Sequence, residues 1–299
     1  MAARDARLDR SASRGRKSIT SGVIGTPRAL CYGPAMMGSV QPVGDLLREW
    51  RQRRRLSQLD LACNAEISTR HLSFVETGRA QPSREMVLLL AEVLDVPLRE
   101  RNRLLRAAGF ADQYRETALD DPQLAAARRA LEFVLDRHEP FPAAVVGPAW
   151  DVRMANRAAM RLILHFAPQG GPRPNLMRLL FDPRGARPFV VNWEEVASGM
   201  IQRVHREALA GGPGCPSETL LRELLDQPDV PSDWRQPDLL RDTAPYFQLV
   251  LEKDGLRLAL FTTIATFGTP HDVTLQELRL ETFFAADEAT DAALRRLAG

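Results

Sequence analysis

The segment "LSQLDLACNAEISTRHLSFVETGRAQPS", residues 56–83, decides how the first part of the chain is organised. Ser57, Ser68 and Ser83 each precede a run in which apolar residues recur every three or four positions. A serine in that position accepts a hydrogen bond from the opening turn of a helix, so each is a predicted N-cap. We therefore predict a helix after Ser57, a tight turn, and a short helix that begins at Ser68 and ends before Gly78.

The opening turn of that short helix carries polar residues outside its apolar stripe, namely Thr69, Arg70, His71 and Ser73. In a helix-turn-helix, the start of the second helix lies in the major groove of DNA. Arginine can donate two hydrogen bonds to guanine there, and threonine can contact a base or the thymine methyl group. We predict that these four side chains contact bases.

Four further residues are candidates for the phosphate backbone, where contacts set the register of a protein without reading sequence. Gln58 opens the preceding helix, and Thr77, Arg79 and Arg84 flank the loop that follows the short helix.

Three more predicted helices surround this pair. They begin at Val43, after Ser83 and at Pro97, and Gly109 ends the last one. An all-α, five-helix DNA-binding domain is therefore predicted over residues 41–112. Asn64 is the residue we expect to supply left-handed backbone in the turn, because asparagine tolerates that conformation.

The order of these residues resembles the phage-repressor-like helix-turn-helix (XRE) family. The matching positions are Leu56, Ser57, Gln58, Leu61, Ala62, Ser68, Glu76, Gly78 and Pro82. The resemblance implies sequence-specific binding to double-stranded DNA.

Residues 113–299 have a mixed pattern that predicts an α+β domain. Strands are predicted at "PAAVVG" and "WDVRMAN", on both sides of Lys253-Asp254-Gly255, and at "LQELRLETFFAAD". In the last strand, Leu278 to Phe284 alternate with polar residues that include Glu281, which predicts one buried and one exposed face. Helices are predicted at 156–166, 176–181, 193–210, 217–226 and 287–298. Because the strands come in adjacent hairpins, the sheet is predicted to be mostly antiparallel.

This part, together with "SREMVLLLAEVLDVPLRERNRLLRAAGF", resembles the MmyB-like transcription regulators. The resemblance rests on "WDVRMANRAA", "NWEEVASGMI" and "IATFGTPHDVTLQELRLETFFAADEAT". It implies a PAS-like ligand-binding domain, with an antiparallel sheet, that takes a small apolar, fatty-acyl-like effector. Apolar residues that either line such a pocket or simply form core are Trp150, Met160, Trp193, Phe247, Phe261 and Phe267.

Charge divides the chain in the same place. Residues 1–115 hold 20 Lys/Arg and 12 Asp/Glu (+8), whereas residues 116–299 hold 20 and 26 (−6), which together give the net charge of +2. A polyanion is therefore the expected partner of the first part only. Residues 1–40 are predicted to be a disordered basic tail, which is either a DNA-contacting arm or an extension upstream of a natural start at Met36 or Met37.

Other classes of protein are disfavoured. No apolar run approaches the roughly 20 residues of a membrane span. The three cysteines are far apart, as in a cytoplasmic protein with free thiols, and Cys215 could be a thiol sensor at a helix start. The five histidines lack metal-ligand spacing and no catalytic set is visible, so we expect neither a cofactor, a metal nor an enzyme.

The sequence thus predicts a cytoplasmic regulator that binds an inverted-repeat operator as a homodimer and responds to a small-molecule effector, for which a fatty acid is the candidate. The alternative is a regulator whose C-terminal domain only mediates dimerisation or binds a protein partner.

Overall fold

The computed structural model describes residues 41–171, 173–236 and 248–298, and residues 41–299 belong to one compact unit. The predictions for residues 1–40 and for Phe247 lie outside the described residues.

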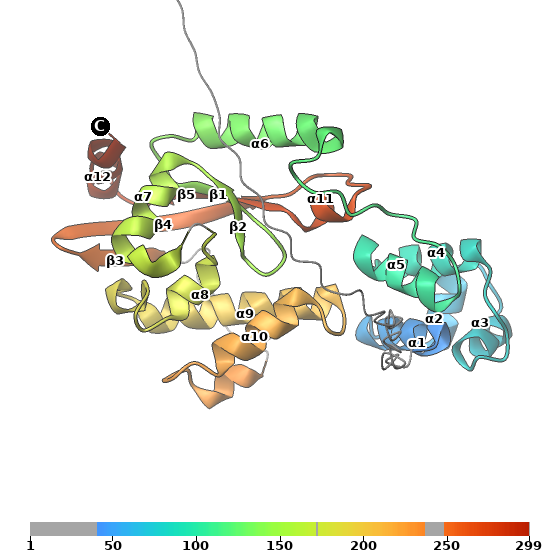
Figure 1. The fold of residues 1–299 in the computed structure, drawn as a ribbon. Helices are drawn as coiled ribbons and strands as arrows, with labels where there is room; N and C mark the ends of the chain where they lie inside the picture. The colour runs from blue at the N-terminus through green and yellow to red at the C-terminus, as the bar shows by residue number, and fades with distance from the viewer. Residues whose placement is uncertain (1–40, 172, 237–247, 299) are drawn as a thin grey trace, which may run out of the picture. The chain divides into compact units, whose positions relative to one another are not determined.

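The first part is helical, as predicted (Figure 1). Its helices are α1 (Val43–Arg53), α2 (Gln58–Asn64), α3 (Thr69–Glu76), α4 (Arg84–Val93) and α5 (Leu98–Ala107). Ser57, Ser68 and Ser83 each accept a hydrogen bond from a backbone N–H in the following turn, so all three predicted N-caps are confirmed. Apolar residues of all five helices form one buried core, with Trp50 its largest member.

The turn between α2 and α3 corrects one prediction. Asn64 is the last residue of α2 and is helical, whereas Glu66 takes the left-handed conformation with φ of 53°. The helix continues through Asn64 to its C-cap at Ala65, so the chain reverses only after that residue.

The second part contains seven helices and five strands in its described residues. They are α6 (Ala125–Arg137), β1 (Ala143–Val146), β2 (Val152–Ala155), α7 (Arg157–Phe166), α8 (Leu176–Phe181), α9 (Trp193–Gly211), α10 (Pro216–Leu225), β3 (Leu249–Lys253), β4 (Leu256–Ala265), α11 (Val273–Glu277), β5 (Arg279–Ala285) and α12 (Glu288–Ala298). The sheet has the order β2-β1-β5-β4-β3, and every neighbouring pair is antiparallel. The predicted α+β class and PAS-like sheet are confirmed.

Helices cover both faces of this sheet. Leu131 and Leu135 of α6 pack with Ala143 and Val145 on one face. The larger core lies on the other face, where α7 to α10 and α12 pack against the sheet (Figure 1). Asn156, the N-cap of α7, ties these layers together because its amide oxygen accepts from the backbone N–H of both Ala143 and Ala159.

The last strand differs from its predicted pattern. Glu281, expected on the exposed face, is 3% exposed, and Glu277, expected in the strand, lies in α11. The alternation misleads because β5 is central in the sheet and is covered on both faces. Asp272 begins α11 by accepting from the backbone N–H of Thr274, as a cap residue should.

The segment between the two parts is anchored at both ends. The Asn102 side chain of α5 accepts from the backbone N–H of Tyr114, and Asp272 accepts from that of Thr117. Arg99 of α5 also pairs with Glu277 of α11 at 2.6 Å. The segment between the two parts is therefore held by side-chain hydrogen bonds, and α5 and α11 are in direct contact.

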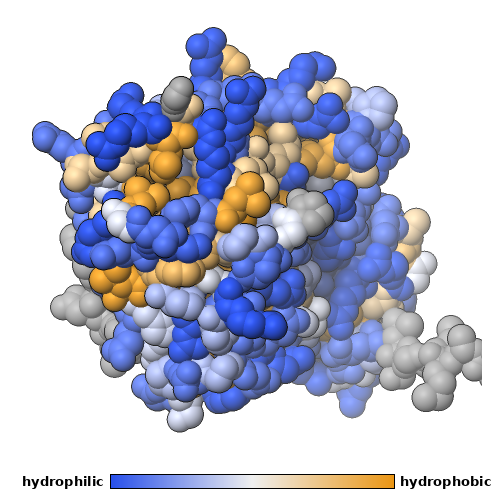
Figure 2. All heavy atoms as spheres, turned by 60° about the vertical axis from the view of Figure 1, so that its left-hand side comes forward, coloured by the Kyte–Doolittle hydropathy of each residue, from blue (hydrophilic) through white to orange (hydrophobic). Residues whose placement is uncertain are grey.

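Part of the surface is apolar. Figure 2 shows one face on which hydrophobic side chains gather between hydrophilic ones. Large apolar residues that are exposed in the described chain include Leu164 of α7 (58% exposed), Phe133 of α6 (61%) and Leu297 of α12 (42%).

Gly44 allows α1 to approach the end of α3. A Cβ atom at this position would lie 2.8 Å from the carbonyl oxygen of Glu76 and would clash with that of Val75. Both obstacles are backbone atoms, so a side chain here can be accommodated only if the two helices move apart.

We predict that Gly44→Ala destabilises the helical domain by about 1–3 kcal/mol, because the overpacking outweighs the better helix propensity of alanine. Thermal unfolding, with amide hydrogen exchange over residues 43–108 to locate the effect, measures this. Gly268→Ala is the control, since nothing lies within 4 Å of a Cβ atom there. Unchanged or increased stability of the Gly44 variant would contradict the close approach.

Candidate functional site

The opening turn of α3 presents polar side chains outward. Arg70 is exposed, and Thr69, His71 and Ser73 are half-buried. The guanidinium of Arg70 lies 5.4 Å from the centre of the Phe74 ring, a cation–π contact that orients it without covering it. The structure therefore brings the four predicted base-contacting residues together on one short helix.

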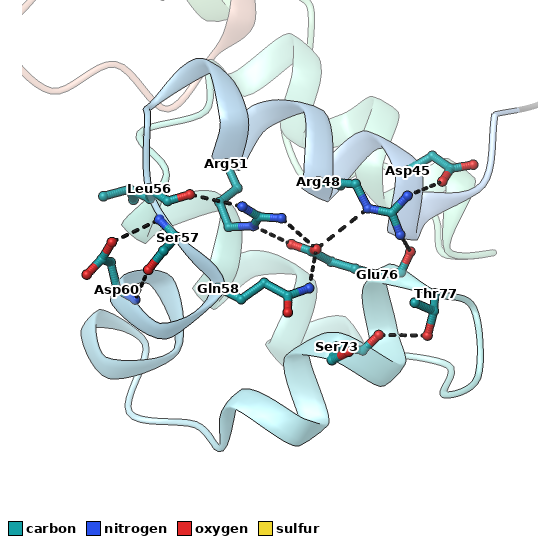
Figure 3. Close-up of polar contacts among 10 residues, drawn as sticks. All are labelled: Asp45, Arg48, Arg51, Leu56, Ser57, Gln58, Asp60, Ser73, Glu76 and Thr77. Atoms are coloured by element: carbon teal, nitrogen blue, oxygen red, sulfur yellow. Dashed lines mark hydrogen bonds and ion pairs between the residues drawn. The ribbon is translucent and has the colours of Figure 1, made fainter.

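The other end of α3 is fixed by Glu76, whose side chain is 0% exposed (Figure 3). Its carboxylate accepts from Arg51 of α1 at 2.7 and 2.9 Å and from Gln58 of α2 at 2.8 Å. Arg48 of α1 donates to the Glu76 backbone carbonyl at 2.7 Å. We call these four residues the Glu76 network; it joins three helices through one buried carboxylate.

Burial alone would raise the pKa of Glu76, but hydrogen bonds from Arg51 and Gln58 outweigh it and the pKa is lowered. A lowered carboxyl pKa contributes stability that is present above the unfolded value, 4.5 here, and is lost as the pH falls through the folded value. The network is therefore expected to be intact at neutral pH and to weaken in acid.

Three of the four residues predicted to contact phosphates donate hydrogen bonds within the protein. Gln58 donates to Glu76, Thr77 donates to the Ser73 carbonyl at 2.7 Å, and Arg84 donates to the Ala111 carbonyl at 3.0 Å and to Gln113. Thr77 has a single hydroxyl hydrogen, so a contact that it donated to DNA would replace this bond, whereas the Gln58 amide and the Arg84 guanidinium carry further N–H groups. Arg79 is exposed just after Gly78.

A second candidate site is a cavity of about 150 Å³ between the sheet and helices α7, α8 and α9. Leu162 and Phe166 of α7, Met177 of α8 and Met200 of α9 are among its lining residues. Of the described residues that line it, only Trp150, Thr262 and Glu281 carry a polar side-chain group. A cavity of about this size and character holds one benzene-sized apolar group in other proteins.

Of the predicted pocket residues that the structure describes, only Trp150 borders this cavity. Trp150 lines it, whereas Met160, Trp193, Phe261 and Phe267 are absent from its described lining. Trp193 packs against Phe181, Phe261 stacks on Phe284, and Phe267 joins the core under α6. Apolar character alone does not distinguish residues that line a pocket from residues that only form core, so the sequence could not separate these positions from Trp150.

Four charged residues stand at the Trp150 end of the cavity, and we call them the arginine–glutamate cluster: Arg203, Glu207, Arg279 and Glu281. Arg203 pairs with Glu281 at 3.3 Å and with Glu207 at 3.2 Å, and Arg279 also donates to Glu207. Glu207 accepts a hydrogen bond from the Trp150 indole at 2.9 Å. The guanidinium groups of Arg203 and Arg279 lie 4.4 and 5.3 Å from the centre of the Trp150 ring. The sequence alone does not reveal this cluster, because its members lie on two elements, α9 and β5, and the paired residues are 72 or more positions apart.

Burial raises the pKa of Glu281 to about 7, although Arg203 and Arg279 act against it. A raised carboxyl pKa has the opposite consequence from that of Glu76. The contribution to stability is complete below the unfolded value of 4.5 and is lost as the pH rises towards 7.

The structure gives less support to other kinds of site. Burial raises the pKa of Cys215, the reverse of what a helix-start thiol sensor requires, so that interpretation is wrong. No three His, Cys, Asp or Glu side chains within the described ranges are grouped to hold a metal ion. No helix in that part of the chain is long and apolar enough to cross a membrane.

Comparison with known proteins matches both parts of the chain to families. Residues 127–297 match the family described as the MmyB-like transcription regulator ligand binding domain. The chain belongs to the MmyB-like transcription regulators. Residues 42–104 match a helix-turn-helix domain family. The chain thus combines a helix-turn-helix domain with an MmyB-like ligand-binding domain, as the resemblance predicted.

Individual relatives cover less of the chain. Proteins named as uncharacterized HTH-type transcriptional regulators from Mycobacterium bovis and Mycobacterium tuberculosis are 35% identical over 101 residues. That segment is 33% of this chain and 40% of theirs. The solved structure of an RNA-binding light-oxygen-voltage receptor aligns with 86% of this chain and 62% of its own at 13% identity. Its TM-score of 0.26 is too low to carry an argument.

We predict that Glu76→Ala lowers the stability of the helical domain by about 3 kcal/mol at pH 7, because it leaves the largely buried Arg51 without its partner. Amide hydrogen exchange of residues 43–108 measures the loss. Glu49→Ala is the control: it removes a carboxylate of α1 that pairs with Arg53 at 3.3 Å on a more exposed surface. The difference between wild type and Glu76→Ala should shrink below pH 4.5; a pH-independent difference would contradict the role of the carboxylate.

Proposed function

We propose that this regulator binds an inverted-repeat operator as a homodimer and that an apolar, acyl-like effector in the sheet cavity changes its affinity for DNA. The observation that carries the effector class is the cavity itself, which is lined almost wholly by apolar side chains beside a single cluster of charges. Apolar pockets with a few polar groups at one end suit ligands that have a hydrocarbon body and one polar group.

For DNA we assign base contacts to Thr69, Arg70, His71 and Ser73 on the opening turn of α3. Three features support this: the exposure of Arg70, the capped start of the helix at Ser68, and the fixing of its far end by Glu76. We assign a phosphate contact first to Arg79, which is exposed. Gln58, Thr77 and Arg84 are secondary candidates, since their donors are engaged within the protein.

A homodimer suits this helix-turn-helix domain, because two recognition helices separated by one turn of DNA, roughly 34–36 Å, read an inverted repeat. The exposed apolar residues of the second part, on the face drawn in Figure 2 and on α6, support self-association. The effector would then favour one arrangement of the dimer over another, which changes operator affinity by the difference in its binding to the two. A regulator of this kind acts in the cytoplasm.

We predict that Arg70→Ala weakens binding to a preferred sequence by about 1–3 kcal/mol while it affects random DNA much less. Arg79→Ala should weaken binding to both DNAs alike and reduce the salt dependence by about one ion. The preferred sequence comes from selection with the full chain on a random library, and titration at several salt concentrations gives the affinities.

Arg184→Ala, which removes a 90% exposed arginine from the second part, is the control for a simple loss of charge. If Arg70→Ala and Arg79→Ala each lost equal affinity for selected and random DNA, these assignments would be overturned.

We also predict that saturating octanoate raises the melting temperature of the wild type, and that Ala159→Leu removes this shift by filling the cavity that Ala159 lines. A ligand at 100 times its Kd stabilises a protein by about 2.7 kcal/mol, enough to measure. Ala126→Leu on the exposed side of α6 is the control. If no chain of six to ten carbons shifts the wild type, the second domain acts without such an effector and the dimerisation-only alternative is favoured.

A further inference from the structure

The cavity meets a single ionisable side chain among its described lining residues, that of Glu281. This side chain is 4% exposed and is flanked by the other members of the arginine–glutamate cluster. The remaining lining is apolar apart from the Trp150 indole and the Thr262 hydroxyl. A ligand with one polar group therefore meets Glu281 if that group enters at the cluster end.

The charges of the cluster determine what that group can be. With Glu281 ionised, two arginines and two glutamates sum to zero, and a carboxylate placed beside Glu281 would be repelled in a site of low dielectric. With Glu281 neutral, Arg203, Arg279 and Glu207 leave one positive charge. That charge is complementary to one carboxylate, and the protonated Glu281 can donate a hydrogen bond to it.

We propose that the cluster is a carboxylate site that works by proton uptake: an acyl chain enters the cavity carboxylate first, and Glu281 takes one proton from solvent as it binds. This inference rests on the proposed acyl-like effector and specifies its head group. The effector affinity thereby depends on pH, and the regulator reads acyl-chain concentration and acidity together.

Within the described part of the chain, the charged groups that act on Glu281 are those of the cluster. Arg203 and Glu207 come from α9 and Arg279 from β5 itself. On the flanking strands its partners are Ala144 of β1 and Ile264 of β4, which carry no charge. Helices α7 and α8 contribute only apolar side chains to the described lining.

The protonation state of Glu281 near neutrality supports the proposal, since burial raises its pKa to about 7. If only the protonated form binds a carboxylate, the apparent affinity scales with the protonated fraction. That fraction falls from about 0.9 at pH 6 to about 0.1 at pH 8, so affinity should fall about tenfold. Octanoate itself stays ionised across this range, as do simple carboxylates.

The test is isothermal titration of the full chain with octanoate and with octanamide, a neutral chain of the same length, from pH 6 to 8. Octanoate should lose about tenfold in affinity, while octanamide should change little. Titrations in buffers of different ionisation enthalpy should show an uptake of about 0.9 proton per octanoate at pH 8 and about 0.1 at pH 6.

Glu281→Gln keeps the shape of the side chain and a permanently neutral donor. It should bind octanoate about tenfold more tightly than wild type at pH 8, with no pH dependence, a gain that misfolding cannot imitate. Glu252→Gln, which removes an exposed carboxylate of β3 that pairs with Arg257, should behave as wild type.

The outcomes separate the two proposals. Octanoate binding that is independent of pH in the wild type, or weaker in Glu281→Gln at pH 8, would overturn the proton-uptake site and leave the acyl-like effector in place. Failure of both octanoate and octanamide to bind at any pH would overturn the effector class and this site with it.

Discussion

The carboxylate of Glu76 is the interaction on which the DNA-binding half depends. A short helix of eight residues has little stability of its own, so its orientation must come from its neighbours. Glu76 provides that orientation by accepting hydrogen bonds from α1 and α2 at once, and Gly44 lets α1 come close enough for the bonds to form. An ionised carboxylate is tolerated at this depth only because its oxygens are paired.

The ligand-binding half uses a buried carboxylate in a different way. Glu76 accepts hydrogen bonds from Arg51 and Gln58 and remains charged, whereas Glu281 pairs with Arg203 at 3.3 Å, borders an apolar cavity and keeps its proton until about pH 7. One glutamate thus fixes a helix, and the other leaves a cavity wall able to change its charge. The contrast follows from the balance between burial and hydrogen bonding: burial raises the pKa of both carboxyls, and only at Glu76 do the hydrogen bonds outweigh it.

Local signals predicted the helices and the sheet well. The serines before α2, α3 and α4 and the Lys253-Asp254-Gly255 turn act over a few residues, so they can be read without a structure. The candidate sites were harder to predict from the sequence, because the partners of Glu76 lie 18 to 28 positions away along the chain and those of Glu281 up to 78. The polar alternation of β5 also misled, since it assumes that one face of a strand is wet, and helices cover both.

Helix α3 separates two tasks between its ends. Its first turn carries the side chains that face outward, and its last residue holds it to the rest of the domain. Outward positions such as Arg70 share no partner with Glu76, so exchanges there should leave the anchoring bonds undisturbed. Duplicated copies of such a chain can therefore diverge in the surface that α3 presents while the scaffold stays unchanged.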